Sequence, residues 1–205
     1  YFKRKNWNFE GKTMGITGLG KMGYSLARTL QKKGMLITSI GFREYYLYNE
    51  KGINIKKLVN CLKINKDITS FGKKIPKDKM IIETFLYVEA ARENMITMEN
   101  YHKFQPQVLA EISNIGIAPD VYNKFPNTEI IPDIILNVGG VLTSFIEYQF
   151  NLTGFSLELN KNHIKSEIDK IINPALDSIY NYQKKYNCSL REACYELALS
   201  RLSMG

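Results

Sequence analysis

Cysteine, histidine and tryptophan are scarce in this chain of 205 residues, which holds three cysteines, two histidines and one tryptophan. Cys188 and Cys194 are spaced too widely for a Cys-x-x-Cys metal site, and only His102 and His163 are at hand to complete one. An odd, sparse set of cysteines also argues against a disulfide framework. We therefore expect no metal site and a reducing, cytoplasmic compartment.

Acidic residues are outnumbered, and long apolar runs are missing. The 20 Asp and Glu against 28 Lys and Arg give a net charge of +8, but the lysines are spread along the chain. Spread lysines favour a solvated basic surface over a nucleic-acid interface, and such a surface also attracts anionic cofactors and substrates. No apolar run approaches the roughly 20 residues that span a bilayer. We expect neither a nucleic-acid nor a membrane partner.

The given sequence does not start with methionine. It begins at Tyr1, and the opening Phe2-Lys3-Arg4-Lys5 has no apolar core of a signal peptide. We therefore expect the sequence to be one part of a longer protein. Its length fits one large domain, or a domain with a helical extension.

One glycine-rich stretch stands out against this background. Gly18-Leu19-Gly20-Lys21-Met22-Gly23 follows an apolar run at 13–17 and precedes a helical pattern at 22–33. A second apolar run at 35–40 completes a strand–helix–strand unit of about 30 residues, the length that such units need. In that context the Gly-x-Gly-x-x-Gly pattern predicts a dinucleotide-binding turn. The alternative is a glycine-rich turn that binds no ligand.

Each glycine has a separate task in such a turn. Gly18 allows the sharp exit from the strand, Gly20 lets the backbone approach a pyrophosphate, and Gly23 lets the helix pack closely on the strand. The phosphates then lie at the helix N-terminus, where free N–H groups and the helix dipole favour negative charge.

The rest of the pattern alternates strands with helices and then becomes helical only. Up to residue 138 we expect strands near 80–88, 106–112 and 129–132, a loop with at most one short strand over 64–80, and helices at 53–63 and after Ala118-Pro119-Asp120. Beyond it we expect helices at 141–150, 161–186 and 190–202. Ser189 and Glu192 predict a capping box at the last helix, and Pro174 predicts a kink or break in the middle one.

This order of elements predicts an α/β fold. We expect a Rossmann-like, doubly wound, mostly parallel sheet with the C-terminal helices packed on it. The predicted organisation is an NAD(P)-binding domain over 1–150 and a helical extension of the same domain over 151–205.

Motifs beyond the glycine turn carry a family resemblance. The most specific is the segment Pro132-Asp133-Ile134-Ile135-Leu136-Asn137-Val138-Gly139-Gly140-Val141, and further matches lie at 11–23, 48–55, 90–97 and 190–195. Together they resemble the C-terminal, cofactor-binding half of the glutamate/leucine/phenylalanine/valine dehydrogenases, with the glutamate dehydrogenases as the nearest branch. The resemblance implies reversible oxidative deamination of an L-amino acid, L-glutamate in that branch, with NAD or NADP as cofactor.

The resemblance also implies roles for single residues. The pyrophosphate would lie against Gly18, Gly20, Lys21, Met22 and Gly23; the adenosine ribose near Ala90 and Ala91; the nicotinamide ribose near Asn114; the nicotinamide beside Asn137; and the substrate side chain against Val141 and Ser144. Structural alternatives remain for three of these places. The segment at 137–140 can be a helix-entry turn, Ala90-Ala91 a close-packed strand end, and Ser144 a partner of its own backbone.

The chain departs from the family pattern at cofactor-facing places. The acidic residue that bonds the adenosine ribose hydroxyls falls on Phe42, although a shift of two residues brings Glu44 into place. Arg43 would instead suit a 2′-phosphate and favour NADP, and Phe42 can stack on adenine or leave the site damaged. Glu89 stands where the family usually has proline. Ile112 begins a loop whose family pattern is Gly-Ala-Asn-Gly-Pro, which is a local conflict.

The catalytic residues of this family belong to the preceding substrate domain. We therefore expect none in this chain, and we expect cofactor binding without turnover, because proton transfer needs positioned side chains. For the full-length protein the resemblance implies a homo-oligomer. Two other hypotheses stay open: a degenerate member that serves as a nucleotide sensor or assembly partner, and a basic nucleic-acid-binding domain.

Overall fold

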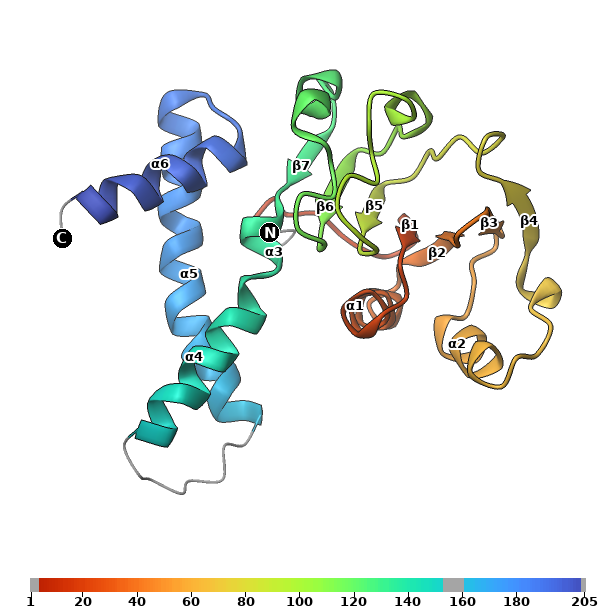
Figure 1. Cartoon of the computed structure of the whole chain (residues 1–205), viewed down its shortest axis with the longest axis horizontal. Coiled ribbons are helices and arrows are strands. Elements are labelled where there is room, and N and C mark those ends of the chain that lie inside the picture. Colours follow the sequence, from red (N-terminus) through yellow and green to blue (C-terminus); the bar gives the residue numbers. More distant parts are fainter. Residues whose placement is uncertain (1–3, 153–160, 204–205) are drawn as a thin grey trace. The chain divides into compact units, whose positions relative to one another are not determined.

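A seven-stranded sheet forms the first of the two units into which the chain divides, residues 1–130 and residues 131–205 (Figure 1). The computed structural model describes residues 4–152 and 161–203. The predicted α/β class is confirmed, since the first unit combines a mostly parallel sheet with helices and the second unit is helical in its described residues. The domain boundary expected at residue 150 stays a prediction; the division into two compact units falls after residue 130.

The strands follow the order β4-β3-β2-β1-β5-β6-β7. Their bounds are β1 Thr13–Thr17, β2 Leu36–Gly41, β3 Tyr45–Tyr48, β4 Lys73–Pro76, β5 Leu86–Glu89, β6 Val108–Glu111 and β7 Glu129–Ile131. Strand β1 pairs in parallel with β2 and β5, and β5 pairs in parallel with β6. Because parallel strands aligned in this way end at one edge, the turns after β1, β2, β5 and β6 lie where ligands bind in such sheets.

The first strand–helix–strand unit folds as its sequence predicts. Helix α1 spans Lys21–Lys32 and buries Gly23, Ala27 and Leu30, the spacing of a single helix face. Lys33 is its C-cap, and Gly34 follows with φ +93° and donates its N–H to the Gln31 carbonyl at 3.1 Å. The connection then enters β2 at once.

Helix α2 spans Ile55–Lys63 and also agrees with the predicted helix at 53–63. Its N-cap is Asn54, whose side chain accepts the Lys57 N–H at 3.0 Å. In Figure 1, α1 and α2 lie on one side of the sheet, and the links from β5 to β6 and from β6 to β7 lie on the other.

The region between β2 and β5 differs from a regular parallel sheet. Strand β3, which sequence patterning missed in the tyrosine-rich stretch, runs antiparallel to β2. It can do so because a three-residue connection suffices for an antiparallel partner, whereas a parallel one needs a crossover. Strand β4 is the short strand allowed for over 64–80, and it pairs antiparallel with β3.

Short 3-10 helices replace longer helices in three links. They are η1 Thr69–Phe71, η2 Tyr101–Lys103 and η3 Pro119–Lys124. The helix expected after Ala118 is therefore a 3-10 helix, with Pro119 in its first turn. The links that hold η2 and η3 pack on a buried apolar cluster that includes Ile82, Tyr87 and Phe104, with the Tyr87 and Phe104 ring centroids 5.0 Å apart.

In its described residues, 131–152 and 161–203, the second unit holds four helices: α3 Asp133–Leu136, α4 Val138–Leu152, α5 Lys161–Tyr186 and α6 Leu190–Ser203. The predicted capping box is confirmed: the Glu192 N–H donates to the Ser189 hydroxyl at 3.2 Å, and the Ser189 N–H donates to Glu192 at 2.8 Å. Pro174 does not divide α5, which continues through it as one helix.

An ion pair joins the first helix of this unit to the last. Arg191 lies 2.7 Å from the Asp133 carboxylate, which also accepts the Ile134 N–H at 2.8 Å. Both side chains are largely buried, so the pair fixes α6 against α3. Within residues 4–152 and 161–203, no helix is long and apolar enough to cross a membrane.

Candidate functional site: a dinucleotide-binding edge of the sheet

The turn between β1 and α1 is closed by contacts that only glycine permits. Gly18 has φ +93°, and a Cβ there would overlap the Ala90 carbonyl at the end of β5. A Cβ on Gly23 would overlap the Gly18 carbonyl and lie 3.2 Å from the Ala90 Cβ. The Ala90 N–H also donates to the Thr17 carbonyl at 2.8 Å. Ala90 therefore holds the turn in place from the neighbouring strand.

Gly20 differs from these two glycines because it faces open space. A Cβ on Gly20 would meet no described atom within 4 Å. Gly20 is the N-cap of α1, and among the described residues no side chain caps this helix start. Lys21 and Met22 are exposed beside it. The first-turn N–H groups are thus available to an anion, and the backbone leaves room for one.

A cavity of about 610 Å³ opens next to this turn. It is lined by residues that end three neighbouring strands and by the link after β4: Thr17, Gly18, Gly41, Phe42, Arg43, Lys77, Ala91, Arg92 and Met95. Several of the predicted cofactor residues therefore meet here, although they are far apart in sequence. The lining belongs entirely to the first unit.

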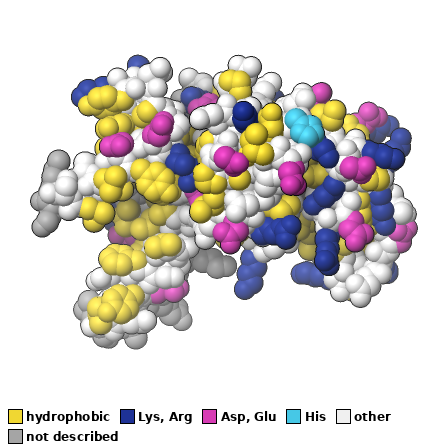
Figure 2. Space-filling model, turned by 45° about the horizontal axis from the view of Figure 1, so that its top comes forward, with side chains coloured by type: hydrophobic (Ala, Val, Ile, Leu, Met, Phe, Trp, Pro, Cys, Tyr) yellow, Lys and Arg dark blue, Asp and Glu magenta, His cyan; other side chains and the backbone are white. Residues whose placement is uncertain are grey.

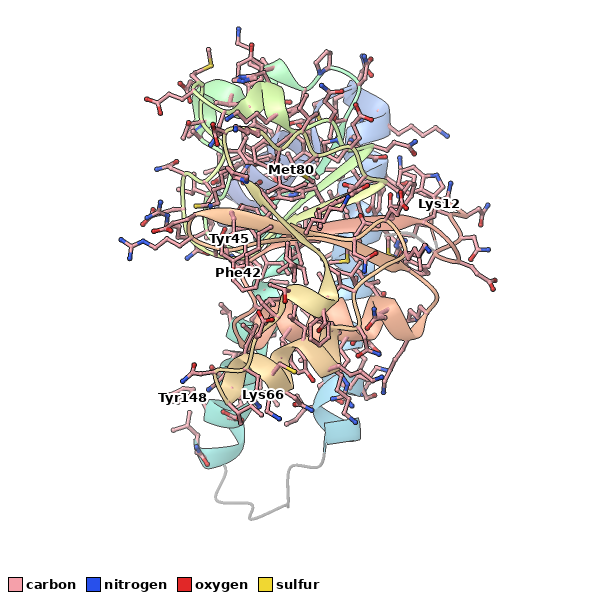
Figure 3. All side chains as sticks on the ribbon, turned by 90° about the vertical axis from the view of Figure 1, so that its right-hand side faces the viewer. Lys12, Phe42, Tyr45, Lys66, Met80 and Tyr148 are labelled. Carbon is pink, nitrogen blue, oxygen red and sulfur yellow. The ribbon has the colours of Figure 1, made fainter. Side chains whose placement is uncertain are left out.

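Phe42 lines the cavity and packs against Tyr45, which lies outside the lining. Phe42 and Tyr45 stack with ring centroids 5.1 Å apart and planes 24° apart, and Figure 3 shows them side by side. Phe42 is half-buried, whereas the side chains of Arg43 and Glu44 are exposed. Arg43 lines the cavity and Glu44 is outside its lining. A flat aromatic face at this place suits a stacked base.

Glu89, at the end of β5, is a buried acid behind the glycine turn. Its carboxylate accepts the Ala91 N–H at 3.1 Å and the Ser113 hydroxyl at 3.2 Å. Burial raises the pKa of Glu89 to about 7, and the nearby charge of Glu111 acts in the same direction. Glu111, its register partner on β6, accepts the Ile117 N–H at 2.9 Å and the Tyr122 hydroxyl. Near pH 7 the acid behind the glycine turn is therefore partly protonated.

The loop after β6 begins at Ile112, where the conflict with the family pattern stays a prediction, and it holds a second unfavourable position at Ile115. Ile112 has an ordinary backbone, while Ile115 has φ +49°, the left-handed region that disfavours β-branched side chains. The other non-glycine residues with positive φ in the described chain are asparagines. Asn114 is exposed in this loop. Ile115 therefore occupies a backbone conformation that glycine or asparagine adopts more readily.

The remaining predicted residues belong to the second unit. Asn137 lies between α3 and α4, and its N–H donates to the Asp133 carbonyl at 2.8 Å. Val141 and Ser144 are exposed on the first turns of α4, and Val141 is 69% exposed. Spacings of four and three residues place Asn137, Val141 and Ser144 on one side of the helix start. Their roles toward nicotinamide and substrate stay predictions.

Two cations at the cavity were missed by sequence reasoning. Lys77 follows β4, Arg92 follows β5, and both line the cavity with Arg43. Figure 2 shows Lys and Arg side chains gathered on the side of the molecule that carries β3 and β4, with acidic side chains among them. No spacing in the sequence links these residues, because the antiparallel excursion of β3 and β4 brings Lys77 to the edge.

This geometry defines an α/β dinucleotide-binding fold. A glycine turn, an uncapped helix start and a cavity at the carboxyl ends of β1, β2 and β5 are the parts that such a fold uses. The particular family follows from comparison with known proteins. Residues 1–204 match the family model of the glutamate/leucine/phenylalanine/valine dehydrogenases, and the chain belongs to that family.

Curated relatives are about twice as long as this chain. It is 27% identical to the NAD-specific glutamate dehydrogenase of Peptoniphilus asaccharolyticus, covering 99% of this chain and 50% of that protein. It is 24% identical to the glutamate dehydrogenase of Thermotoga maritima, covering 93% of this chain and 47% of that protein. The chain therefore spans about half the length of the curated relatives it matches.

Solved structures show the same fold. The hetero-hexameric glutamate dehydrogenase of Thermus thermophilus superposes with a TM-score of 0.85 at 21% identity, over 98% of this chain and 48% of that one. The glutamate dehydrogenase of Peptoniphilus asaccharolyticus gives 0.78 at 25% identity, over 99% and 48%. The predicted family and Rossmann-like fold are thereby confirmed.

Proposed function

We propose that this chain is the NAD(P)-binding half of an amino acid dehydrogenase that interconverts L-glutamate with 2-oxoglutarate and ammonia. The observation that carries the proposal is the turn at Gly18–Gly23. Neighbouring atoms leave no room for a side chain at two of its glycines, whereas Gly20 borders open space at the start of a helix that no described side chain caps. The family membership and the glutamate dehydrogenase relatives support the reaction.

The residues present fit an anionic dinucleotide. The N–H groups of the first turn of α1 and the Lys21 side chain would hold the pyrophosphate, and Phe42 would stack on the adenine. Ala90 and Ala91 would lie along the adenosine ribose, with Asn114 and Asn137 toward the nicotinamide end. The cofactor supplies hydride transfer, and this chain supplies binding and orientation. Val141 and Ser144 would contact the substrate.

Catalysis requires the other half of the protein in this proposal. The proton-transfer residues are expected in a substrate domain that accounts for the additional length of the relatives. We also propose that the complete protein is a cytoplasmic homo-oligomer.

Two measurements on the 205-residue chain test the proposal. Calorimetric titration with NAD and with NADP should show binding of at least one, and no binding of either contradicts the proposed function. An assay of NAD(P) reduction with L-glutamate should show no turnover. Turnover by this chain alone would contradict the assignment of catalysis to the other half.

A degenerate, non-catalytic member is the second candidate. The observation in its favour is that Ile115 occupies a left-handed backbone position in a loop that faces the cofactor in the family pattern. The buried Glu89 behind the glycine turn points the same way. Absence of cofactor binding would favour this candidate, whereas micromolar binding favours the enzyme.

A further inference from the structure

Three cations from three separate segments line the candidate cofactor cavity. Arg43 follows β2, Lys77 follows β4 and Arg92 follows β5, and all three line the same cavity. Among the described residues, no Asp or Glu belongs to that lining. The cavity lining therefore favours binding of an anion over binding of two ribose hydroxyls.

The position of these residues identifies which part of a dinucleotide they would meet. In dinucleotide-binding folds the residue at the end of the second strand contacts the adenosine ribose. An acid there accepts hydrogen bonds from the 2′-hydroxyl, and an arginine accommodates a 2′-phosphate. Here Phe42 and Arg43 directly follow the second strand, and the Glu44 side chain is exposed outside the cavity lining.

Backbone hydrogen bonds and a contact with an aromatic ring hold Lys77 at the cavity. Its backbone N–H donates to the Glu44 carbonyl at 3.4 Å, and its carbonyl accepts from the Lys103 ammonium at 3.4 Å. Its ammonium lies 5.8 Å from the centre of the Tyr46 ring. Burial and then the like charge of Arg92 lower the pKa of Lys77, whereas Glu89 opposes this. A bound anion would relieve the repulsion between the two cations.

Resting on the proposed function, we propose that this cavity selects NADP, with Arg43, Lys77 and Arg92 binding the 2′-phosphate of the adenosine ribose. Arginine can bind phosphate through two parallel hydrogen bonds, and lysine adds a point charge. The pyrophosphate is a separate anion, since it would lie at the start of α1. This cofactor preference would differ from that of the Peptoniphilus asaccharolyticus relative, which is named an NAD-specific glutamate dehydrogenase.

A matched pair of nucleotides isolates the 2′-phosphate. Calorimetric titration of the 205-residue chain with 2′,5′-ADP and with 5′-ADP should show at least about tenfold tighter binding of 2′,5′-ADP. The advantage should shrink as the salt concentration rises, because partly exposed charges are screened. Equal affinities overturn the inference and leave the proposed function standing. Binding of neither nucleotide overturns both.

Substitution then tests the named residues. Lys77→Met and Arg92→Met should each reduce 2′,5′-ADP affinity several-fold and leave 5′-ADP affinity nearly unchanged. Lys79→Met is the matched control, because Lys79 is an exposed lysine outside the cavity lining and makes the same change of charge. Thermal unfolding of each variant verifies the fold. A loss that is equal for both nucleotides, or equal in the control, contradicts the assignment.

Discussion

Two turns follow parallel strands at the same edge of the sheet. Both contain a residue with positive φ, but the residue types differ. The turn after β1 places glycine at positive φ, whereas the loop after β6 places Ile115 there. The first turn is packed against the end of β5, so its glycine is a steric requirement. Ile115 is 40% exposed, so its strain can be tolerated locally. Close packing, rather than backbone conformation alone, decides where glycine is indispensable.

The largest effect should follow from breaking the packed turn. Gly18→Ala forces a Cβ into the Ala90 carbonyl and keeps a left-handed backbone, so we expect a loss of several kcal/mol in the free energy of unfolding. Gly20→Ala is the matched control, since its Cβ enters open space. Urea unfolding should separate the two variants clearly. Equal stabilities would show that the packing at Gly18 is not needed.

Glu89 connects the two turns, and its ionisation should make stability depend on pH. Its pKa is about 7 in the folded chain and 4.5 as a free group, so the folded state holds its proton more tightly. Stability should therefore fall as pH rises from about 4.5 through 7, by on the order of 3 kcal/mol in total.

The Glu89→Gln variant isolates this effect. Glutamine keeps a carbonyl acceptor for the Ala91 N–H and removes the charge, so its stability should change less with pH. Urea unfolding of both proteins at pH 5 and pH 8 gives the comparison, and groups common to the two proteins cancel in the difference. Parallel pH profiles would contradict a proton on Glu89 near neutral pH.

The smallest effect should come from repairing the exposed loop. Ile115→Gly and Ile115→Asn should each stabilise the chain by about 0.5–1 kcal/mol, because an L-residue in the left-handed region costs roughly 1–2 kcal/mol and the lost side chain offsets part of it. Ile112→Asn is a control at a position of ordinary φ and should not stabilise. A rise of the unfolding temperature confined to the Ile115 variants is the expected result.

The same contrast explains what could be predicted from the sequence. Strand β1, helix α1 and strand β2 were predicted because apolar periodicity and the glycine turn lie within one short stretch. Strand β3 was missed because Tyr45–Tyr48 is aromatic on both faces and follows a tight turn. The strand expected at 80–88 is limited to Leu86–Glu89, since Ile82 makes only an isolated bridge to Phe104.

The candidate site was predictable to the extent that its residues lie in motifs. The glycines, Phe42 and Arg43 after β2, and Ala90 and Ala91 after β5 follow from strand ends and from the family resemblance. Lys77 does not, because its place depends on two antiparallel strands that bring a distant segment back. The proton on Glu89 depends on burial and on Glu111 of the next strand, and neither is visible in the chain order.

Both borders of the sheet are poor templates for another strand. Strand β4, at one border, carries Lys73 and Lys74 and ends at Pro76, which has no N–H to donate. Strand β7, at the other, has only three residues. Charged, proline-bearing or very short borders discourage edge-to-edge aggregation. Pairing of sheet borders between copies of this chain is therefore disfavoured, and concentrated solutions should resist fibril formation.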